Sequence, residues 1–176
     1  MNDLHLIRLT KEYECEWHDL IAEFSRDGEI VPMAMKGNTE DFNDFLVYAD
    51  RYAAGTDLPK GHVSSDIYFL VRGDEKRLLG AIDIRHELSE YLLQYGGHIG
   101  YGIRPAERRQ GYAAKMLQLG LIKCRELRIG KVLLTCFTDN VGSVKTMMKN
   151  GAVLENEILD QGRPKQRYWI DLQEVM

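Results

Sequence analysis

Apolar residues recur at helical spacing in some segments of the chain and alternate with polar residues in others. Spacing of three to four residues predicts helices with one buried face, and alternation predicts strands. The predicted strands are 4–9, 66–72, 77–85, 98–103, 131–137, 153–159 and 166–172. The predicted helices are 10–24, 39–52, 111–127 and 140–149. Their order, β-αα-βββ-α-β-α-ββ, predicts an α/β (α+β) fold with a mixed sheet and helices on both of its faces.

Capping and turn residues support this division of the chain. Thr10 and Asn140 are predicted helix N-caps, and Thr39 is expected to open the second helix. A polar turn between 66–72 and 77–85 predicts a hairpin. We expect the three strands after the first two helices to form an antiparallel meander, and the later helical crossovers to add parallel pairing beside it.

Composition indicates one globular domain, residues 1–176, because no Pro/Gly/Ser-rich linker or repeat divides the chain. Hydrophobic residues make up 44% and charged residues 28%, which excludes global disorder. The formal charge of −4 gives no overall attraction for nucleic acid or anionic lipid, and no apolar run is long enough for a membrane span. We therefore expect neither nucleic acid nor a membrane as a partner.

Three cysteines without a CxxC pair argue against both a disulfide framework and a structural zinc site. The first residues show no basic stretch followed by an apolar one, so no signal peptide is expected. These features predict a cytoplasmic protein without a bound metal.

The chemistry is concentrated in residues 98–117, HIGYGIRPAERRQGYAAKML. A strand runs into a basic loop and then into an amphipathic helix, whose N-terminal amides favour phosphate oxygens. Gly111 permits close approach, while Arg108 and Arg109 add positive charge. A dinucleotide-binding fingerprint fails because Pro105 takes the place of its third glycine, and a Walker loop fails because no Gly-Lys-Ser/Thr is present.

Arg108-x-x-Gly111-x-Ala113 resembles the R/Q-x-x-G-x-G/A acetyl-CoA motif of the GNAT N-acetyltransferase superfamily. The segment 139–143, DNVGS, resembles a second family feature, N-x-x-S. The sequences GGHIGYGIRP and QRYWI are similar to a predicted bacterial branch of the superfamily. The order of elements matches over essentially the whole chain, which implies a GNAT-like, mostly antiparallel seven-stranded sheet flanked by helices.

The resemblance implies that backbone amides of residues 108–113 cradle the pyrophosphate of coenzyme A, and that the strand at 101–104 pairs with the pantetheine arm. It also implies that neighbouring strands splay apart there, and the glycines of this strand suit a bulge or close ligand approach. For Asn140, helix capping and cofactor contact both remain open. The expected cofactor contacts are Tyr101, Gly102, Ile103, Arg104, Arg108, Arg109, Gln110, Gly111, Tyr112, Ala113, Asn140 and Ser143.

The resemblance further implies acetyl transfer from acetyl-CoA to a primary amine, which needs a neutral nucleophile and an acid for the thiolate. The family often has Tyr as the acid where this chain has Met147, so Tyr168 is a candidate substitute. His98, where the family often has Glu, and His86 at the end of the neighbouring strand are candidate bases. For each of these three residues a purely structural role is the alternative.

Met147 also leaves open a non-catalytic acyl-CoA sensor with the same fold. For an enzyme, we expect the acceptor, a small-molecule or peptide amine, to meet the loops 25–38 and 55–65 and the hairpin 160–165. A homodimer is possible by analogy with the superfamily.

Overall fold

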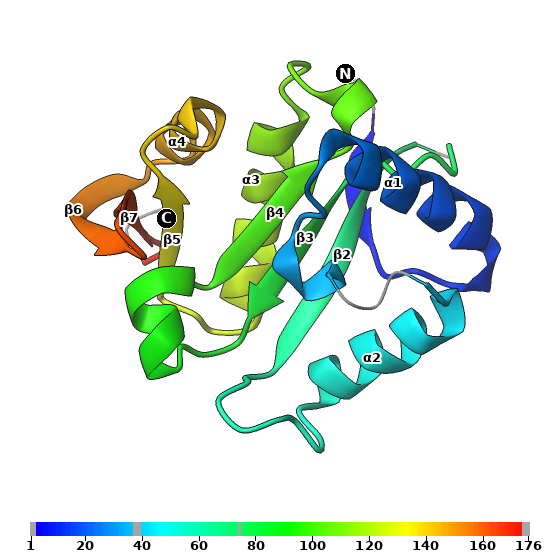
Figure 1. Cartoon of the computed structure of the whole chain (residues 1–176), viewed down its shortest axis with the longest axis horizontal. Helices are drawn as coiled ribbons and strands as arrows, with labels where there is room; N and C mark the ends of the chain where they lie inside the picture. The colour runs from blue at the N-terminus through cyan, green and yellow to red at the C-terminus, as the bar shows by residue number, and fades with distance from the viewer. Residues whose placement is uncertain (1–2, 37–39, 74, 174–176) are drawn as a thin grey trace.

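The computed structural model describes residues 3–36, 40–73 and 75–173 and confirms the predicted order of elements (Figure 1). The strands are β1 (Leu4–Ile7), β2 (Ser65–Arg72), β3 (Gly80–Arg85), β4 (Ile99–Ile103), β5 (Lys131–Phe137), β6 (Val153–Asp160) and β7 (Arg163–Asp171). The helices are α1 (Glu14–Asp27), α2 (Phe42–Ala54), α3 (Tyr112–Glu126) and α4 (Val141–Lys149). Short helical turns at Lys11–Tyr13, Met33–Met35, Leu92–Gly96 and Pro105–Glu107 connect them.

The strands form two sheets rather than the single sheet we expected. One has the order β1-β2-β3-β4 and the other the order β5-β7-β6, and every strand pair in the described residues is antiparallel. The predicted parallel pairing beside the meander is therefore wrong, because no parallel hydrogen-bonded strand pair is present in the described residues. Its place is taken by the gap between β4 and β5, which diverge toward α3 and α4 (Figure 1). The α/β class, with antiparallel sheets flanked by helices, is confirmed.

The two sheets meet at His98, just before β4. Its amide donates to the Leu133 carbonyl over 2.7 Å, and the Leu133 amide donates to His98 Nδ1 over 2.9 Å. At Gly97 an added Cβ would lie 2.6 Å from the same carbonyl, so only glycine lets the two backbones come this close. This contact holds the closed end of the gap between the sheets.

The four-stranded sheet separates two apolar cores because side chains alternate along its strands. Ile82 and Ile84 of β3 pack with Leu117 of α3 on one face. Ala81 packs with Phe24 of α1 in the core on the other face, which α2 also covers. The side of β3 on which a residue lies therefore decides whether it meets α3 or the α1–α2 layer.

Gly100 and Gly102 of β4 lie on the α1–α2 side, as the strand alternation predicts. An added Cβ at Gly102 would lie 2.1 Å from Val31 Cγ2, and one at Gly100 would lie 3.4 Å from Pro32 Cβ. The register between β3 and β4 is continuous, so the predicted bulge is absent from this pairing. These glycines instead admit the loop that follows α1.

One predicted helix cap is wrong, and another falls outside the described residues. Thr10 does not cap the first helix: its hydroxyl donates to Glu12, and a helical turn at 11–13 precedes α1. Thr39 lies outside the described residues, and α2 is capped by Asp41, whose carboxylate accepts from the amides of residues 43 and 44. Within the described ranges, no helix is long and apolar enough to cross a bilayer.

Candidate active site

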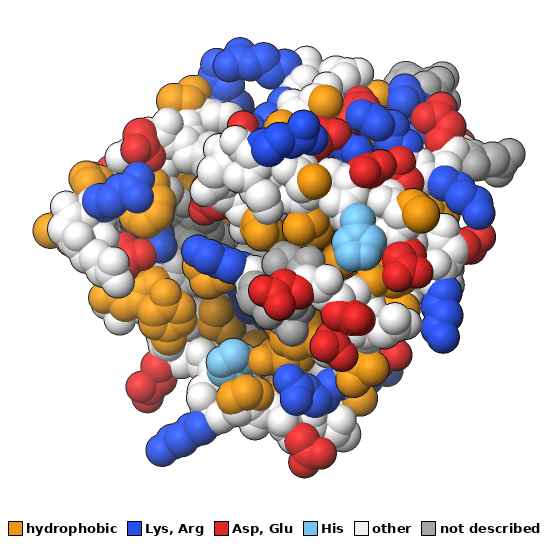
Figure 2. All heavy atoms as spheres, turned by 45° about the vertical axis from the view of Figure 1, so that its right-hand side comes forward, with side chains coloured by type: hydrophobic (Ala, Val, Ile, Leu, Met, Phe, Trp, Pro, Cys, Tyr) orange, Lys and Arg blue, Asp and Glu red, His pale blue; other side chains and the backbone are white. Residues whose placement is uncertain are grey.

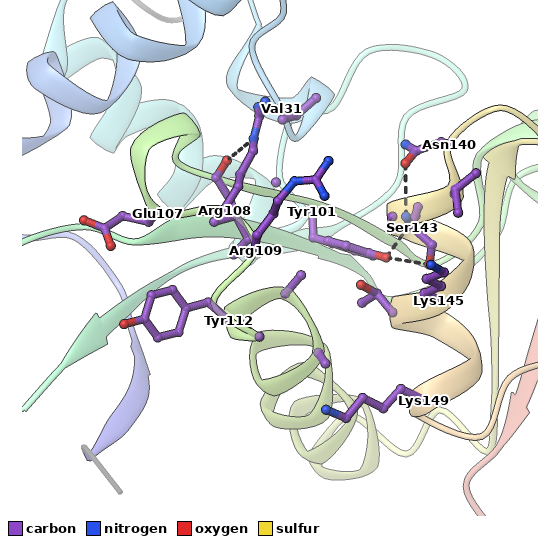
Figure 3. Close-up of a pocket in the computed structure, with 18 of the residues that line it drawn as sticks. Val31, Tyr101, Glu107, Arg108, Arg109, Tyr112, Asn140, Ser143, Lys145 and Lys149 are labelled. Carbon is purple, nitrogen blue, oxygen red and sulfur yellow. Dashed lines mark hydrogen bonds between the residues drawn. The ribbon is translucent and has the colours of Figure 1, made fainter.

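A cavity of about 800 Å³ lies between the ends of β4 and α1 and the N-termini of α3 and α4 (Figure 3). Its lining comes from elements far apart in sequence, because the divergence of β4 and β5 leaves an opening that α3 and α4 border. The lining residues are Asp27, Glu29, Val31, Tyr101, Gly102, Ile103, Glu107, Arg108, Arg109, Gly111, Tyr112, Ala113, Ala114, Asn140, Val141, Gly142, Ser143, Lys145, Thr146 and Lys149.

The N-terminus of α3 opens into this cavity without a side-chain cap. Gly111 is its N-cap, with a φ of 83°, and an added Cβ there would meet nothing within 4 Å. No acidic side chain lies in the first turn. The first amides of α3 therefore keep their hydrogen-bonding capacity and the positive end of the helix dipole for an anion.

Four basic residues line the cavity: Arg108, Arg109, Lys145 and Lys149. Arg108 is oriented twice, because its Nε donates to the Ile103 carbonyl over 3.2 Å and its Nη1 lies 2.7 Å from Asp27. The acidic residues of the lining are Asp27 at the end of α1, Glu29 in the loop after it and Glu107 in the helical turn after β4.

A hydrogen-bonded group joins β4 to α4 across the gap between the sheets. The hydroxyls of Tyr101 and Ser143 are 2.9 Å apart, and the Ser143 amide donates to Asn140 Oδ1 over 3.0 Å (Figure 3). Burial raises the pKa of Tyr101 to about 12, so its phenol is a hydrogen-bond donor at neutral pH. Asn140 thus caps α4, and it also lines the cavity.

Ten of the twelve expected cofactor contacts line the cavity. Arg104 does not, because its buried guanidinium pairs with Glu16 at 2.8 Å and Glu23 at 2.7 Å on α1. Gln110 is exposed and donates to Glu107 over 3.2 Å. The Arg104 side chain ties β4 to α1, so the pairing of its backbone with the pantetheine arm stays a prediction.

His98 is buried at the joint between the sheets, outside the cavity lining. Its Nδ1 accepts from the Leu133 amide, so the proton of the neutral ring sits on Nε2 and neither nitrogen has a free lone pair. Burial, and then the charge of Arg85, lower the pKa of His98 to about 4. These contacts are those of a structural histidine, which was the alternative to a catalytic role for His98.

His86 and Tyr168 also lie away from the cavity. His86 Nε2 is 3.1 Å from the Asp66 carboxylate, on the α3 face of the sheet. Tyr168 packs in the core beside α3, where its hydroxyl donates to Gln166 over 2.8 Å. Neither of the two candidate bases, His86 and His98, lines this cavity, and the Tyr168 hydroxyl already donates to an acceptor.

Met147, in the position where a tyrosine was considered, is fully buried in the α3 core. Two other tyrosines, Tyr101 and Tyr112, line the cavity. Among the residues that the structure describes, no group of three or more His, Cys, Asp or Glu could hold a metal ion.

Comparison with known proteins identifies the family. A family model described as "Acetyltransferase (GNAT) domain" matches residues 5–153. The chain belongs to this family. No curated protein sequence matches it. The GNAT assignment accounts for the uncapped helix and the basic lining, since this family transfers acetyl groups from acetyl-CoA.

Solved structures share the GNAT fold with this chain. RimJ from Mycobacterium smegmatis, in complex with CoA-disulfide, has a TM-score of 0.73 at 14% identity, covering 98% of this chain and 83% of the other. Spermidine N-acetyltransferase from Vibrio cholerae, in complex with CoA and spermine, has a TM-score of 0.67 at 16% identity, covering 97% and 96%. A dodecameric structure of that enzyme has a TM-score of 0.67 at 15% identity, covering 98% and 96%.

The residues present fit coenzyme A. A pyrophosphate must come close to the backbone to accept hydrogen bonds from its amides. The space around Gly111, where an added Cβ would meet nothing within 4 Å, and the uncapped amides of α3 meet this requirement. The signals for the loop were readable in the sequence, but those for Asp27 and the two lysines of α4 were not, since they depend on how α1 and α4 are placed.

Proposed function

We propose that this GNAT protein transfers the acetyl group of acetyl-CoA directly to the primary amine of a small molecule or peptide. The observation that carries the proposal is the uncapped N-terminus of α3, with Gly111 at positive φ and two arginines beside it. Backbone amides of residues 108–113 would hold the pyrophosphate, and the β4 segment at 101–103 would border the pantetheine arm.

The acceptor would enter from the α1–α2 side, opposite the helix that holds the pyrophosphate. Figure 2 shows the face turned toward α1 and α2, on which acidic and basic side chains are mixed rather than gathered by sign. Such a surface, together with the formal charge of −4, does not suit nucleic acid or an anionic membrane and leaves a small or peptide amine as the preferred acceptor. A spermidine acetyltransferase among the fold neighbours supports this class without identifying the molecule.

We further propose that the protein works in the cytoplasm, since all three of its cysteines are free. Homodimer formation remains a prediction. The dodecameric neighbour supports self-association in proteins of this fold, and the elution volume of the purified protein would measure it.

A second candidate function is a non-catalytic acyl-CoA sensor. It is favoured by the buried Met147, which stands where the family often has a tyrosine as the acid. It is also favoured by the positions of His98 and Tyr168 outside the cavity lining. The two candidates differ in turnover and not in cofactor binding. An enzyme releases coenzyme A thiol when some amine is added, whereas a sensor binds coenzyme A and releases none across a broad amine panel.

The binding site itself is tested with Gly111→Val. A β-branched residue at a φ of 83° costs on the order of 1–3 kcal/mol and turns the neighbouring amides away. We expect coenzyme A affinity, measured by calorimetry, to fall at least about tenfold. Gly162→Val is the matched control, since its φ is 82°, its Cβ position is equally open and it lies outside the cavity lining. Equal affinities of the two variants would sink the assignment of this loop.

A further inference from the structure

Asp83 is a buried carboxylate in the middle of β3, with 2% of its surface exposed. In the register of the sheet it lies opposite Gly100 of β4 and Ile67 of β2. Ile67 belongs to the core under α1 and α2, so Asp83 points to the same side of the sheet. This is the side from which the acceptor is proposed to enter.

One oxygen of Asp83 has no partner. Oδ2 lies 3.2 Å from Arg85 Nη2, but Oδ1 is fully buried and has no hydrogen bond. The other terminal nitrogen of Arg85, Nη1, is engaged elsewhere, since it donates to the carbonyls of Gly96 at 3.3 Å and Gly97 at 3.0 Å. Buried carboxylate oxygens in folded proteins are nearly always paired, so Oδ1 calls for a donor.

The other buried aspartate of this sheet shows the contrast. Asp66 of β2 lies on the α3 face, opposite Ile84 in the register. Its two oxygens are taken by Arg8 and by His86 Nε2, the latter at 3.1 Å. A carboxylate with only a structural role is thus fully paired here, while the one facing the acceptor side is left with a free oxygen.

We propose that Asp83 Oδ1 binds the ammonium group of a primary alkylamine acceptor and takes a proton from it before transfer. This inference rests on the proposed acetyl transfer and names the residue that selects and activates the acceptor. Gly100, opposite Asp83, is part of the strand expected to border the pantetheine arm, so the carboxylate lies next to the expected path of the thioester. The acceptor would reach it past Val31 and Pro32, which pack over the two glycines of β4.

The proton and bond changes balance without another reactant. The ammonium R–NH₃⁺ gives one proton to the carboxylate, and the neutral amine attacks the thioester carbonyl carbon. The C–N bond forms, the C–S bond breaks, and the second nitrogen proton passes to the leaving sulfur to give the thiol. Asp83 then releases its proton to solvent, and the net products are the acetamide, coenzyme A and one proton.

Two tyrosines of α2 and a histidine lie between the surroundings of Asp83 and the 55–65 loop. The ring of Tyr48 on α2, whose pKa is raised by burial and then by the neighbouring Tyr52 and Asp83, lies 4.3 Å from the ring of Tyr52. The Tyr52 hydroxyl is hydrogen-bonded to Nδ1 of the exposed His62. His62 belongs to the 55–65 loop, which we expected from the sequence to meet the acceptor.

The surroundings of Asp83 suit a base. Burial raises the pKa of this carboxyl, while the charge of Arg85 and a hydrogen bond from Ser65 act in the opposite direction. The charged and titratable groups around it are Arg85, Asp66, His86 and Tyr48. A carboxyl whose pKa lies above its usual range is a better match for proton transfer near neutrality.

The test compares Asp83→Asn with wild type and with Asp66→Asn, the other buried aspartate. Each coenzyme A-loaded protein is titrated with pentylamine by calorimetry, and acetyl transfer is measured to pentylamine and to methoxyamine, which is uncharged at neutral pH. We expect Asp83→Asn to weaken pentylamine binding at least about tenfold and to lower kcat/KM for pentylamine by about 10²–10⁴-fold. The loss for methoxyamine should stay below about tenfold, because that amine needs no deprotonation.

Coenzyme A affinity and thermal unfolding of the same variants show whether each protein is folded. Asp66→Asn should keep its pentylamine affinity and turnover within about threefold. Pentylamine that fails to bind wild type, or that binds Asp83→Asn equally well, overturns the inference, as does an equal loss of transfer to both amines. Pentylamine bound through Asp83 without any acetyl transfer refutes the proposed activity and leaves the ammonium site standing.

Discussion

Arg108 is paired with an acidic residue at the place where its charge is proposed to meet coenzyme A. Its Nη1 lies 2.7 Å from Asp27, and both side chains are more than one-third exposed. Exposed ion pairs contribute only about 0–1 kcal/mol. The pair is therefore weak enough for a pyrophosphate to displace, but the anion must compete with Asp27 for the guanidinium.

Asp27→Asn should raise coenzyme A affinity by about two- to fivefold at low salt, because it removes this competing charge from the cavity wall. The gain should shrink as salt screens the site. Calorimetry at two ionic strengths measures both effects. Asp19→Asn, an exposed aspartate of the same helix that does not line the cavity, should leave the affinity unchanged. Unchanged or weaker binding by Asp27→Asn would show that the pair orients Arg108 rather than competing for it.

The two glycines of β4 allow the loop after α1 to pack directly against this strand. A Cβ at Gly102 would come within 2.1 Å of Val31 Cγ2 and 3.0 Å of the Val31 carbonyl, so the loop would have to move. A Cβ at Gly100 would meet its nearest neighbours at 3.4 and 3.5 Å. Gly100 and Gly102 lie on the same face of β4 but differ in the space available for a Cβ, so alanine substitutions at the two positions can be compared directly.

Gly102→Ala should lower the free energy of unfolding by about 1–3 kcal/mol, the usual range for overpacking, because its clash involves backbone as well as side-chain atoms. Gly100→Ala should change it by less than about 0.5 kcal/mol. Urea unfolding of both variants at one pH measures the difference. Equal stabilities would mean that the loop rests on β4 less tightly than these contacts indicate.

The elements could be predicted where local signals and tertiary structure agree. The strand at 98–103, the helix after Gly111 and the cap at Asn140 were all readable, because turn and capping chemistry depends on neighbouring residues. The site was readable only in part. Asp83 and Asp27 give no motif, since their importance arises from the register of β3 with β4 and from where α1 ends.

The positions of the two candidate histidines were not readable from the sequence for a related reason. A histidine at a strand end can face a cleft or a neighbouring backbone, and the sequence does not distinguish the two. His98 meets the Leu133 amide because the second sheet approaches at that residue, and His86 meets Asp66 because of the strand register. Both outcomes depend on packing between segments more than 15 residues apart.

At the scale of the whole molecule, the two sheets share one apolar core and are also joined by hydrogen bonds at His98. At the closed end of the gap, His98 just before β4 exchanges two hydrogen bonds with Leu133 of β5, and the Thr135 hydroxyl donates to the Tyr95 carbonyl nearby. The hydroxyls of Tyr101 and Ser143 link the same two halves farther along. Because His98 Nδ1 must be unprotonated to accept the Leu133 amide, the joint requires the neutral ring. Acid should therefore weaken the contact between the sheets.

The pKa of His98 is lowered from 6.5 to about 4 by burial and then by Arg85. Well above pH 6.5 the ring is neutral in both the folded and the unfolded state and contributes almost no pH dependence. Between pH 6.5 and 4 the unfolded chain binds the extra proton, so stability falls as pH falls, by about 2 kcal/mol at pH 5. Urea unfolding at about pH 7.5 and pH 5 measures the loss. His98→Asn, whose amide oxygen can still accept from Leu133, should lose less stability on acidification, and His18→Gln, an exposed control, should lose as much as wild type. Equal losses in all three proteins would place the acid sensitivity elsewhere.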